Sequence, residues 1–367
     1  MSFRGLRVTA IAGGVGAARM LRGLAAVTGE DSLTAVVNTG DDTVLHGLYV
    51  CPDLDTITYT LGGAANPATG WGIEGETWAV MEALGHFERL GLPGAGSLTW
   101  FSLGDRDLAT HLFRTGRLAA GVPLSQVASE VAARFGVAAR LLPMSDDPVR
   151  TMVTLAQGTP VPSFGGLGRT AAPGAYGGPG THHGTASAHD GAGAPAEVGF
   201  QEYFVGLRHS VQVAGLRFAG AERARPAPGV IEAIEQADVV VVCPSNPLVS
   251  IGPVLAVPGI ARAVAARRRS VVAVSPIVAG RALKGPADRM LSELGSEASV
   301  AGVARLWSDI ASTLVIDEAD AALGPQVEQA GMACAVTGTV MSGPDESARL
   351  AEVVLTAASG TASSGGR

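Results

Sequence analysis

A short apolar run that leads directly into glycines is the feature that most restricts the fold of this chain. Residues 8–12 have the pattern of a β-strand, Gly13, Gly14 and Gly16 follow at once, and residues 20–26 have helical spacing. Glycine lets the backbone approach a ligand closely, and the free N–H groups at a helix start point toward anions. We therefore predict a phosphate or nucleotide site here, with the three glycines binding. A tight glycine turn without a ligand would have the same sequence.

The turn matches neither of two common nucleotide motifs. In the dinucleotide fingerprint G-x-G-x-x-G, a third glycine would stand where Arg19 is, and the next strand would end at an acidic residue. Here that strand, residues 34–37, ends at Asn38, and both departures argue against a nicotinamide-dependent oxidoreductase. A G-x-x-x-x-G-K-[ST] loop is excluded as well, because Lys284 is the only lysine in the sequence.

Strand-like runs alternate with helical ones along much of the chain. Such alternation implies a mostly parallel sheet covered on both faces, with ligands at the carboxyl ends of the strands. With 367 residues, 47% of them hydrophobic, the chain can bury a large core. We predict a Rossmann-like α/β fold with a smaller lobe of helices and a β-hairpin, forming one domain over residues 1–345. The expected strands are 8–12, 35–37, 98–103, 153–156, 200–205, 239–243 and 271–275, and the expected helices are 76–90, 124–135 and 230–236.

Residues 158–197 interrupt this pattern. The segment consists mostly of Gly, Ala, Pro, Ser and Thr, which bury too little apolar surface to offset the entropy of ordering. We interpret it as a disordered insertion between two strands. Its His182, His183 and His189 permit a metal site, but a solvated low-complexity loop is the interpretation that the composition favours. Residues 358–367 are expected to be a disordered tail.

Charge and cysteine content restrict the partners and the compartment. The net charge of −7 argues against a nucleic-acid-binding protein, which needs a basic surface. Cys51, Cys243 and Cys334 are odd in number and widely spaced, so we expect no disulfide framework and a reducing compartment. The N-terminal apolar stretch is shorter than a signal peptide, and no run approaches transmembrane length. We expect a cytoplasmic protein without membrane association.

Adjacent carboxylates follow the second strand. Asp41 and Asp42 stand at its end, opposite the glycine turn, and Asp53 and Asp55 follow shortly afterwards. A divalent cation such as Mg²⁺ neutralises such a pair and bridges to phosphate oxygens, so Asp41 and Asp42 are the candidate metal ligands. A remaining carboxylate can take the proton of an attacking hydroxyl, which makes Asp42 and Asp55 the candidate catalytic residues. We expect Asp53 to cap the helix that begins near residue 54.

A second polar motif follows the run 98–103. Its Arg106 has a planar fork that suits a phosphate, while Asp105 and Arg106 together could equally lock the turn. Asp107 is expected to be a helix N-cap. His111 then lies one turn into that helix, where it is either a functional or a buried structural residue.

Two later loops bring further polar groups to the same edge of the sheet. Ser245 and Asn246 follow the strand 239–243 and can hydrogen-bond a nucleobase or a diphosphate, although turn residues would look the same. Lys284 lies in an exposed loop after the strand 271–275 and carries a cation toward this edge.

These motifs resemble the 2-phospho-L-lactate transferase family of coenzyme F420 biosynthesis. They occur in the family's order from about residue 6 to residue 340, and only the insertion 158–197 lies clearly outside the pattern. The matching segments are 13–16 (GGVG), 38–42 (NTGDD), 51–56 (CPDLDT), 103–107 (LGDRD), 142–147 (LPMSDD), 200–203 (FQEY), 244–247 (PSNP) and 275–277 (SPI).

The resemblance implies a magnesium-dependent transfer reaction. A guanosine diphosphate ester of lactate, or of enolpyruvate in actinobacterial members, would give its phospho-acyl end to a hydroxyl of the deazaflavin Fo and release GMP. The second aspartate of P-D-L-D-T binds the deazaflavin in the family, which corresponds to Asp55. A further contact position, often lysine or glutamine, is occupied by Ser102, so this chain departs from the pattern there. The family also implies a homodimer.

An alternative is a regulatory protein that binds nucleotide sugars and resembles the gluconeogenesis factor. Such proteins carry a D-D-G-G-S-S-G stretch after the second strand, whereas this chain has D-D-T-V-L-H-G over residues 41–47 and keeps P-D-L-D-T. The sequence therefore favours the transferase. It does not distinguish lactyl, enolpyruvyl and glyceryl donors.

Overall fold

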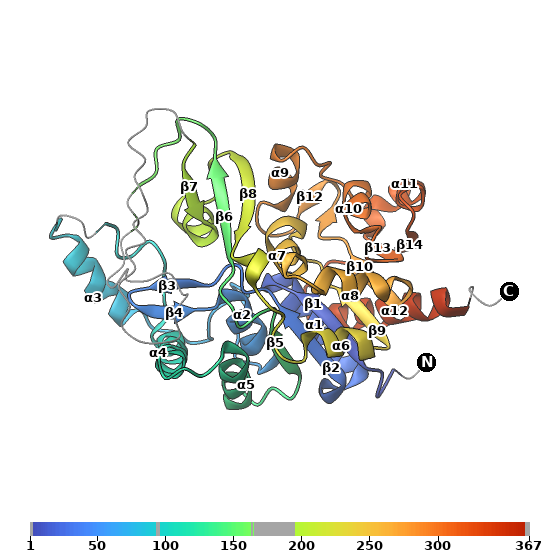
Figure 1. Cartoon of the computed structure of the whole chain (residues 1–367), viewed down its shortest axis with the longest axis horizontal. Helices are drawn as coiled ribbons and strands as arrows, with labels where there is room; N and C mark the ends of the chain where they lie inside the picture. The colour runs from blue at the N-terminus through green and yellow to red at the C-terminus, as the bar shows by residue number, and fades with distance from the viewer. Residues whose placement is uncertain (1–2, 93–95, 163, 165–194, 364–367) are drawn as a thin grey trace.

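The centre of the molecule is a parallel β-sheet. A computed structural model describes residues 3–92, 96–162, 164 and 195–363, and within them this sheet has seven strands in the order β14-β13-β10-β9-β1-β2-β5 (Figure 1). The predicted Rossmann-like fold is confirmed. The strands are β1 (Val8–Ala12), β2 (Leu33–Val37), β5 (Arg140–Pro143), β9 (Val239–Val242), β10 (Val271–Val274), β13 (Thr313–Ile316) and β14 (Ala333–Val336).

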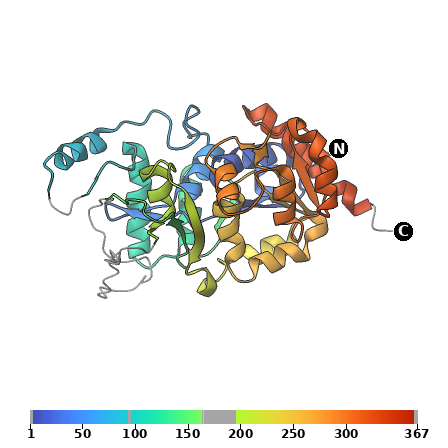
Figure 2. The same cartoon turned by 90° about the horizontal axis from the view of Figure 1, so that it is seen from above.

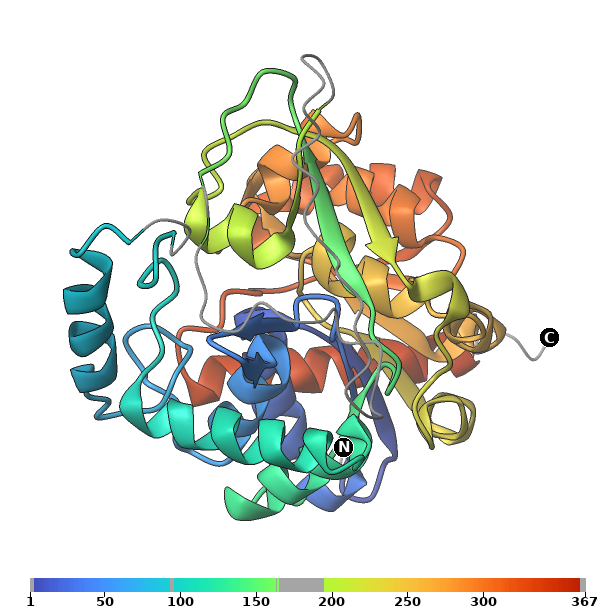
Figure 3. The ribbon, with the colours of Figure 1, turned by 60° about the vertical axis from the view of Figure 1, so that its left-hand side comes forward.

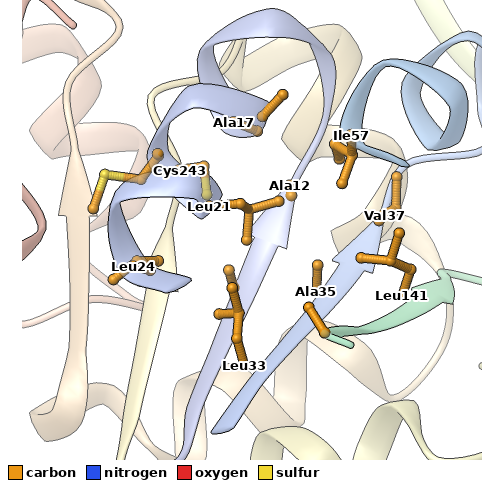
Figure 4. Packing of buried hydrophobic residues seen from close by; sticks show 14 of the residues in the cluster. Ala12, Ala17, Leu21, Leu24, Leu33, Ala35, Val37, Ile57, Leu141 and Cys243 are labelled. Atoms are coloured by element: carbon orange, nitrogen blue, oxygen red, sulfur yellow. The ribbon is translucent and has the colours of Figure 1, made fainter. Parts of the chain in front are cut away.

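Helices cover both faces of this sheet because side chains alternate along each strand. Ala10 and Ala12 of β1 point into one apolar cluster, shown in Figure 4, while Ile11 points into the cluster on the opposite face. Helices α1 (Gly14–Thr28), α2 (Pro52–Leu61), α5 (Leu124–Arg134) and α12 (Pro344–Ser363) pack on the first face. Helices α6 (Val230–Gln236), α7 (Gly252–Ala256), α8 (Ile260–Ala266), α9 (Ala287–Glu293), α10 (Val300–Trp307) and α11 (Gly324–Gln329) pack on the second.

Smaller elements form the predicted second lobe beside the carboxyl edge of the sheet. They are the hairpin β3 (Thr43–Leu45) and β4 (Leu48–Val50), the helices α3 (Ala79–Glu88) and α4 (Asp105–Ala119), the antiparallel sheet of β6 (Arg150–Leu155), β7 (Glu197–Gly199) and β8 (Val213–Ala219), and the short pair β11 (Ile277–Val278) and β12 (Arg281–Ala282). Figures 2 and 3 show α3 standing away from the main sheet.

Within the described ranges, no single helix is long and apolar enough to cross a membrane, although the bent pair Pro247–Ala256 and Ile260–Ala266 reaches that length and composition jointly.

The expected strand over 98–103 is wrong. The chain forms one isolated bridge there, between Ser97 and Phe164, and otherwise runs as a loop. Leu103 packs with Leu45 and Val50 of the hairpin instead of entering the sheet. An apolar run becomes a strand only where a neighbouring strand offers hydrogen bonds, and within the described part of the chain residues 98–103 pair with no strand.

The expected strand over 200–205 is also wrong. β7 ends at Gly199, and residues Glu202–Gly206 form a π-helical turn. Phe200, Tyr203 and Phe204 are three and four residues apart, so a helical turn places them on one apolar face, where the first two are buried. The spacing in this run is therefore helical, and it does not alternate as a strand would.

The insertion is narrower than expected, and the tail is helical. Phe164 is buried and its ring centroid lies 5.2 Å from that of Trp100, while Glu197 begins β7. Residues 165–194, with the three histidines, lie outside the described residues. At the other end α12 continues to Ser363 and buries Ala358 in the core, which corrects the expected tail from residue 358.

Deleting residues 165–194 and joining the ends with a short turn is expected to leave turnover unchanged. The composition of this segment gives it no core to contribute, and the cut spares Phe164 and Glu197. A deletion of 158–197 is the matched control, and we expect its melting temperature to fall because both contacts are lost. Strong loss of activity in a folded 165–194 deletion would assign this segment a catalytic role.

Candidate active site

The site lies where the strand order of the main sheet changes direction. From β1 the chain proceeds outward through β2 to β5, then returns to the other side of β1 and continues through β9, β10, β13 and β14. Ligands of open α/β sheets bind at the carboxyl ends of the strands at such a point. The loops after β1 and β9 meet here, because Ser245 Oγ donates to the Gly13 carbonyl at 2.7 Å and a side chain on Gly16 would collide with the Pro244 carbonyl.

The glycine turn itself is filled by Asp53. Asn38 Nδ2 donates to Asp53 Oδ2 at 2.9 Å, and a Cβ atom on Gly13 would lie 2.8 Å from the same oxygen. A hydrogen bond from the backbone of Gly14, which has φ +73°, also reaches this carboxylate. The prediction that Asp53 caps α2 is therefore wrong. Cys51 holds the N-cap position of α2, and the Asp53 side chain turns toward α1. The helix-start amides already face a carboxylate.

Asp41 and Asp42 lie in the turn after β2 and are buried, at 6% and 8% exposure. One carboxylate oxygen of each, Oδ1, is buried without a hydrogen-bond partner. Burial raises the pKa of both groups well above the ordinary range, and the neighbouring Asp53 raises the pKa of Asp41 further. Unpaired buried carboxylate oxygens are costly unless a cation or a proton satisfies them. This pair therefore fits the requirements of a divalent cation site.

Two small hollows open on these carboxylates, and Asp42 and Arg150 line both. One of them also has Asp41, Thr151 and Gln201 in its wall. The hydroxyl of Thr151 is buried without a hydrogen-bond partner, like the two Asp oxygens. Gln201 belongs to the F-Q-E-Y segment, which the π-helical turn brings to this place although β7 lies far from β2 in sequence.

Asp55 belongs to a second buried network, centred on Arg114 of α4. The guanidinium of Arg114 donates to both oxygens of Asp55 and approaches His111 Nδ1 at 3.3 Å. On the other side of the ring, His111 Nε2 lies 3.4 Å from Asp107 Oδ1. Tyr59 donates to Asp107 at 2.5 Å. Burial raises the pKa of Asp55, and Arg114 opposes this shift.

Asp55, Asp107 and His111 also form a group that could hold a metal ion, since one ligand atom from each lies within 4.8 Å of the others. In this arrangement, however, Arg114 already neutralises Asp55. Among the described residues Asp41 and Asp42 form no ion pair, and Oδ1 of each is buried without a hydrogen-bond partner. The chemistry of the two groups therefore favours Asp41 and Asp42 for a hard cation.

The remaining predicted residues lie around this centre. Asn246 accepts from Leu248 N at 2.9 Å and thereby caps the π-helical turn Pro247–Ile251, so part of its polar capacity serves the loop. Ser102 and Arg106 are exposed, and the Arg106 guanidinium donates to the Glu74 carbonyl at 2.9 Å, which sets both apart from the buried acids. Lys284 is exposed beside the first turns of α1.

The start of α4 is capped differently from the prediction. Its N-cap position is Gly104, and Asp107 lies inside the helix. The Glu76 carboxylate accepts the backbone N–H groups of Arg106 and Asp107 at 2.7 and 2.8 Å. Asp105 in turn accepts the N–H groups at the start of α3, which explains why that helix begins at Ala79 instead of Glu76. Asp107 is thereby free to face His111.

Comparison with known proteins agrees with this arrangement. The family described as 2-phospho-L-lactate transferase CofD matches residues 8–335, which is nearly the whole chain. The chain belongs to this family. The phosphoenolpyruvate transferase of Kitasatospora aureofaciens is 42% identical over 95% of this chain and 97% of its own length. Proteins of the same name from Streptomyces coelicolor and Mycolicibacterium smegmatis are 40% and 36% identical, over 96% and 95% of this chain and 98% of their own lengths.

Solved structures agree on the fold of this CofD-family transferase. A crystal structure of a UPF0052 family member from Bacillus halodurans superposes with a TM-score of 0.56 and covers 95% of this chain and 99% of its own. At 14% identity it supports the α/β architecture alone. Membership of the CofD family establishes the chain as a transferase enzyme.

Two residues at the centre of this transferase were missed from the sequence. Arg114 could have been found, because residues 107, 111 and 114 are spaced four and three apart on an expected helix and so share one face. Thr151 gave no comparable signal, since it reaches the site through β6 pairing across the sequence with β7 and β8. Its N–H donates to the Gly40 carbonyl at 2.7 Å, which ties β6 to the turn that carries Asp41.

The raised pKa of Asp53 predicts a pH dependence of stability. Burial raises this pKa from 3.8 to about 6, so the folded protein holds the proton more tightly than the unfolded chain. The resulting stabilisation is complete below about pH 4 and is lost as the pH rises through about 6. We expect the melting temperature of the metal-free protein to fall between about pH 4 and pH 6, and to fall less in Asp53→Asn. Thermal unfolding followed by circular dichroism checks this; equal slopes would assign the effect to other groups.

Proposed function

We propose that this enzyme moves a phosphoenolpyruvyl or phospholactyl group from a GDP-linked donor to the deazaflavin Fo. The products are GMP and coenzyme F420-0 or its dehydro form. The observation that carries the proposal is the pair of buried, unpaired carboxylates of Asp41 and Asp42 at the switch point of the sheet. The names of the relatives from Kitasatospora, Streptomyces and Mycolicibacterium support the enolpyruvyl donor.

The resemblance of the motifs to the F420 family implies Mg²⁺, and the residues present fit it. Asp41 and Asp42 would hold the ion, because their unpaired oxygens are the hard ligands that Mg²⁺ prefers. When bound, Mg²⁺ supplies positive charge to the phosphate oxygens of the donor. Without a cation the two groups keep raised pKa values, so binding the ion would displace protons from them.

The chain's own residues would position the two substrates. The loop residues Gly13, Gly14, Gly16, Ser245, Asn246 and Lys284 are proposed to hold the donor, and Asp55, Ser102 and Arg106 the acceptor. The Fo hydroxyl oxygen would form a bond to the phosphorus that carries the acid, while the bond from that phosphorus to the GMP oxygen breaks. Asp42 or Asp55 would accept the hydroxyl proton, and GMP would leave with the electrons of the broken bond.

The proposal extends to the setting of the enzyme. We infer a single transferase domain, a homodimer, and a cytoplasmic location that gives access to both small-molecule substrates. Nucleic acid and membranes are not expected as partners, given the net charge of −7.

The direct test is to incubate the full chain with Fo, Mg²⁺ and, in separate reactions, the lactyl, enolpyruvyl and glyceryl diphosphoguanosine donors. Mass spectrometry of the products identifies which donor is used. We expect the enolpyruvyl donor to give dehydro-F420-0 with one GMP released per product. A reaction that proceeds without Fo, or forms no product with any donor, would overturn the proposal.

A further inference from the structure

Three cations gather on one face of α1, next to the glycine turn. Arg19 and Arg22 are three residues apart and so lie on the same face of the helix. Helical side chains lean toward the N-terminus, which carries the Arg19 guanidinium back toward Val15. A Cβ atom placed on Gly70 would lie 3.3 Å from Lys284 Nζ, 3.8 Å from Arg19 Nη2 and 2.9 Å from Val15, so Lys284 and Arg19 converge on one point beside the first turn of α1.

These cations are not neutralised by the protein. Among the residues that the structure describes, no carboxylate forms an ion pair with Arg19, Arg22 or Lys284. Arg19 donates to the Met341 carbonyl at 2.9 Å and Lys284 to the Thr69 carbonyl at 2.9 Å. The Nε of Arg22 is buried without a hydrogen-bond partner. Like charges held together in this way repel one another unless an anion binds between them.

We propose that Arg19, Arg22 and Lys284 form the subsite for the diphosphate of the nucleotide donor. This inference rests on the proposed function and names the part of the site that recognises the leaving nucleotide. Two guanidinium forks and one ammonium supply planar and point-like donors, a combination that suits adjacent phosphate groups. A single carboxylate would leave most of this positive charge unpaired.

The position of Asp53 explains why side-chain cations are needed here. In many nucleotide sites the free amides at the helix start bind the phosphate. In this chain Asp53 accepts from Asn38 and from the Gly14 backbone, so those donors already face a negative charge. The diphosphate of the donor would therefore be neutralised by the cations one turn further along α1, while the glycine turn would contact the rest of the donor.

The loop around Gly70 completes the subsite. Lys284 ties this loop to the segment after β12 through the Thr69 carbonyl. Gly70 has φ +76° and no side chain, and a Cβ atom there would collide with Val15 of α1 and crowd Lys284. The next residue, Trp71, is 48% exposed. An exposed indole next to Gly70, where these cations converge, offers a stacking surface for the base of a nucleotide. Its fluorescence provides a signal for binding that does not depend on turnover.

The test measures binding of GDP, GMP and guanosine to the full chain by calorimetry, with inorganic pyrophosphate as a base-free probe. We expect Lys284→Gln and Arg22→Gln each to reduce the affinity for GDP and for pyrophosphate about tenfold or more, since each substitution removes a charge-assisted contact. Guanosine should bind as before. Arg22→Lys should recover part of the lost affinity. Raising the salt concentration should reduce GDP affinity less in the two Gln variants than in the wild type.

Arg223→Gln is the matched control, because Arg223 is an exposed arginine in a different part of the fold, after β8. It should change none of these affinities. Unchanged GDP affinity in both Lys284→Gln and Arg22→Gln would overturn the subsite, as would equal weakening of GDP and guanosine. Product formation by the wild type is scored separately. If the wild type makes no product but the two Gln variants bind GDP more weakly than the wild type, the proposed reaction is wrong and the anion subsite is still supported.

Discussion

Asp42→Asn is expected to reduce turnover by about 100-fold or more while the fold remains intact. The substitution keeps the shape of the side chain but removes a buried carboxylate whose Oδ1 has no partner within the protein. Losing a preorganised charge at a reacting phosphoryl group costs about this much in other enzymes. Stability should change little or rise, because burial already raises the pKa of Asp42 and penalises its charged form.

Magnesium dependence separates this role from a structural one. We expect 100 Kd of Mg²⁺ to stabilise the wild type by about 2.7 kcal/mol in thermal unfolding and to leave Asp42→Asn nearly unchanged. Asp317→Asn is a suitable control, because Asp317 is also buried at the carboxyl edge of the sheet but is fully used in bonds to Thr339 and Ala319. It should lose stability and keep its response to Mg²⁺. An Asp42→Asn enzyme that stays active at limiting Mg²⁺ would remove Asp42 from the metal site.

The elements that were predicted correctly carry their own structural signal. The run 8–12, the glycines after it and the valines of 239–242 specify a buried parallel strand through composition alone, since both faces of the strand are covered. The run 98–103 is equally apolar, but whether it pairs depends on a free sheet edge, which no local pattern encodes. The run 200–205 differs, because here a local pattern was informative: the spacing of Phe200 and Tyr203 is that of a helical turn and not of the strand we expected.

For the candidate site, as for the fold, positions that follow from the strand order could be predicted from the sequence. Asp41 and Asp42 could be placed at the carboxyl edge of the sheet because they follow β2, while their role as metal ligands stays a prediction. The side chains that contact the site aspartates depend on packing between distant parts of the chain, so the strand order does not predict these contacts. Asp53 lies in the first turn of α2, as a cap would, yet only the approach of α1 turns its carboxylate toward Asn38 and Gly14. Arg114 pairs with Asp55 across 59 residues of sequence.

Charge is divided across this site in a way that suits two substrates. Asp41, Asp42 and Asp53 gather carboxylates at the ends of β1 and β2, while Arg19 and Arg22 lie further along α1, with Lys284 close to Arg19. A diphosphate donor with its cation would bridge the two regions, with the reacting phosphorus nearest the carboxylates. If Asp55 binds the acceptor as proposed, the acceptor hydroxyl approaches from the side of Asp55, which Arg114 holds in place.

The pairing of Asp55 with Arg114 decides how the acceptor site must be tested. Asp55→Ala alone leaves Arg114, which is 2% exposed, with an uncompensated charge, so we expect a loss of about 3–5 kcal/mol in unfolding free energy. The Arg114 guanidinium, whose pKa burial would lower and Asp55 raises, stays charged in that variant. Loss of Fo binding in Asp55→Ala could then reflect a damaged fold.

The double variant Asp55→Ala/Arg114→Met removes both charges and fills the space with an apolar side chain, so most of the stability should return, as measured by urea unfolding. If Asp55 binds the acceptor, Fo affinity should stay reduced by about tenfold to more than a hundredfold in the double variant, while GDP affinity with Mg²⁺ is retained. Recovery of Fo binding together with stability would make Asp55 purely structural. Equal weakening of Fo and GDP would instead move Asp55 to the metal, because only a metal ligand serves both substrates at once.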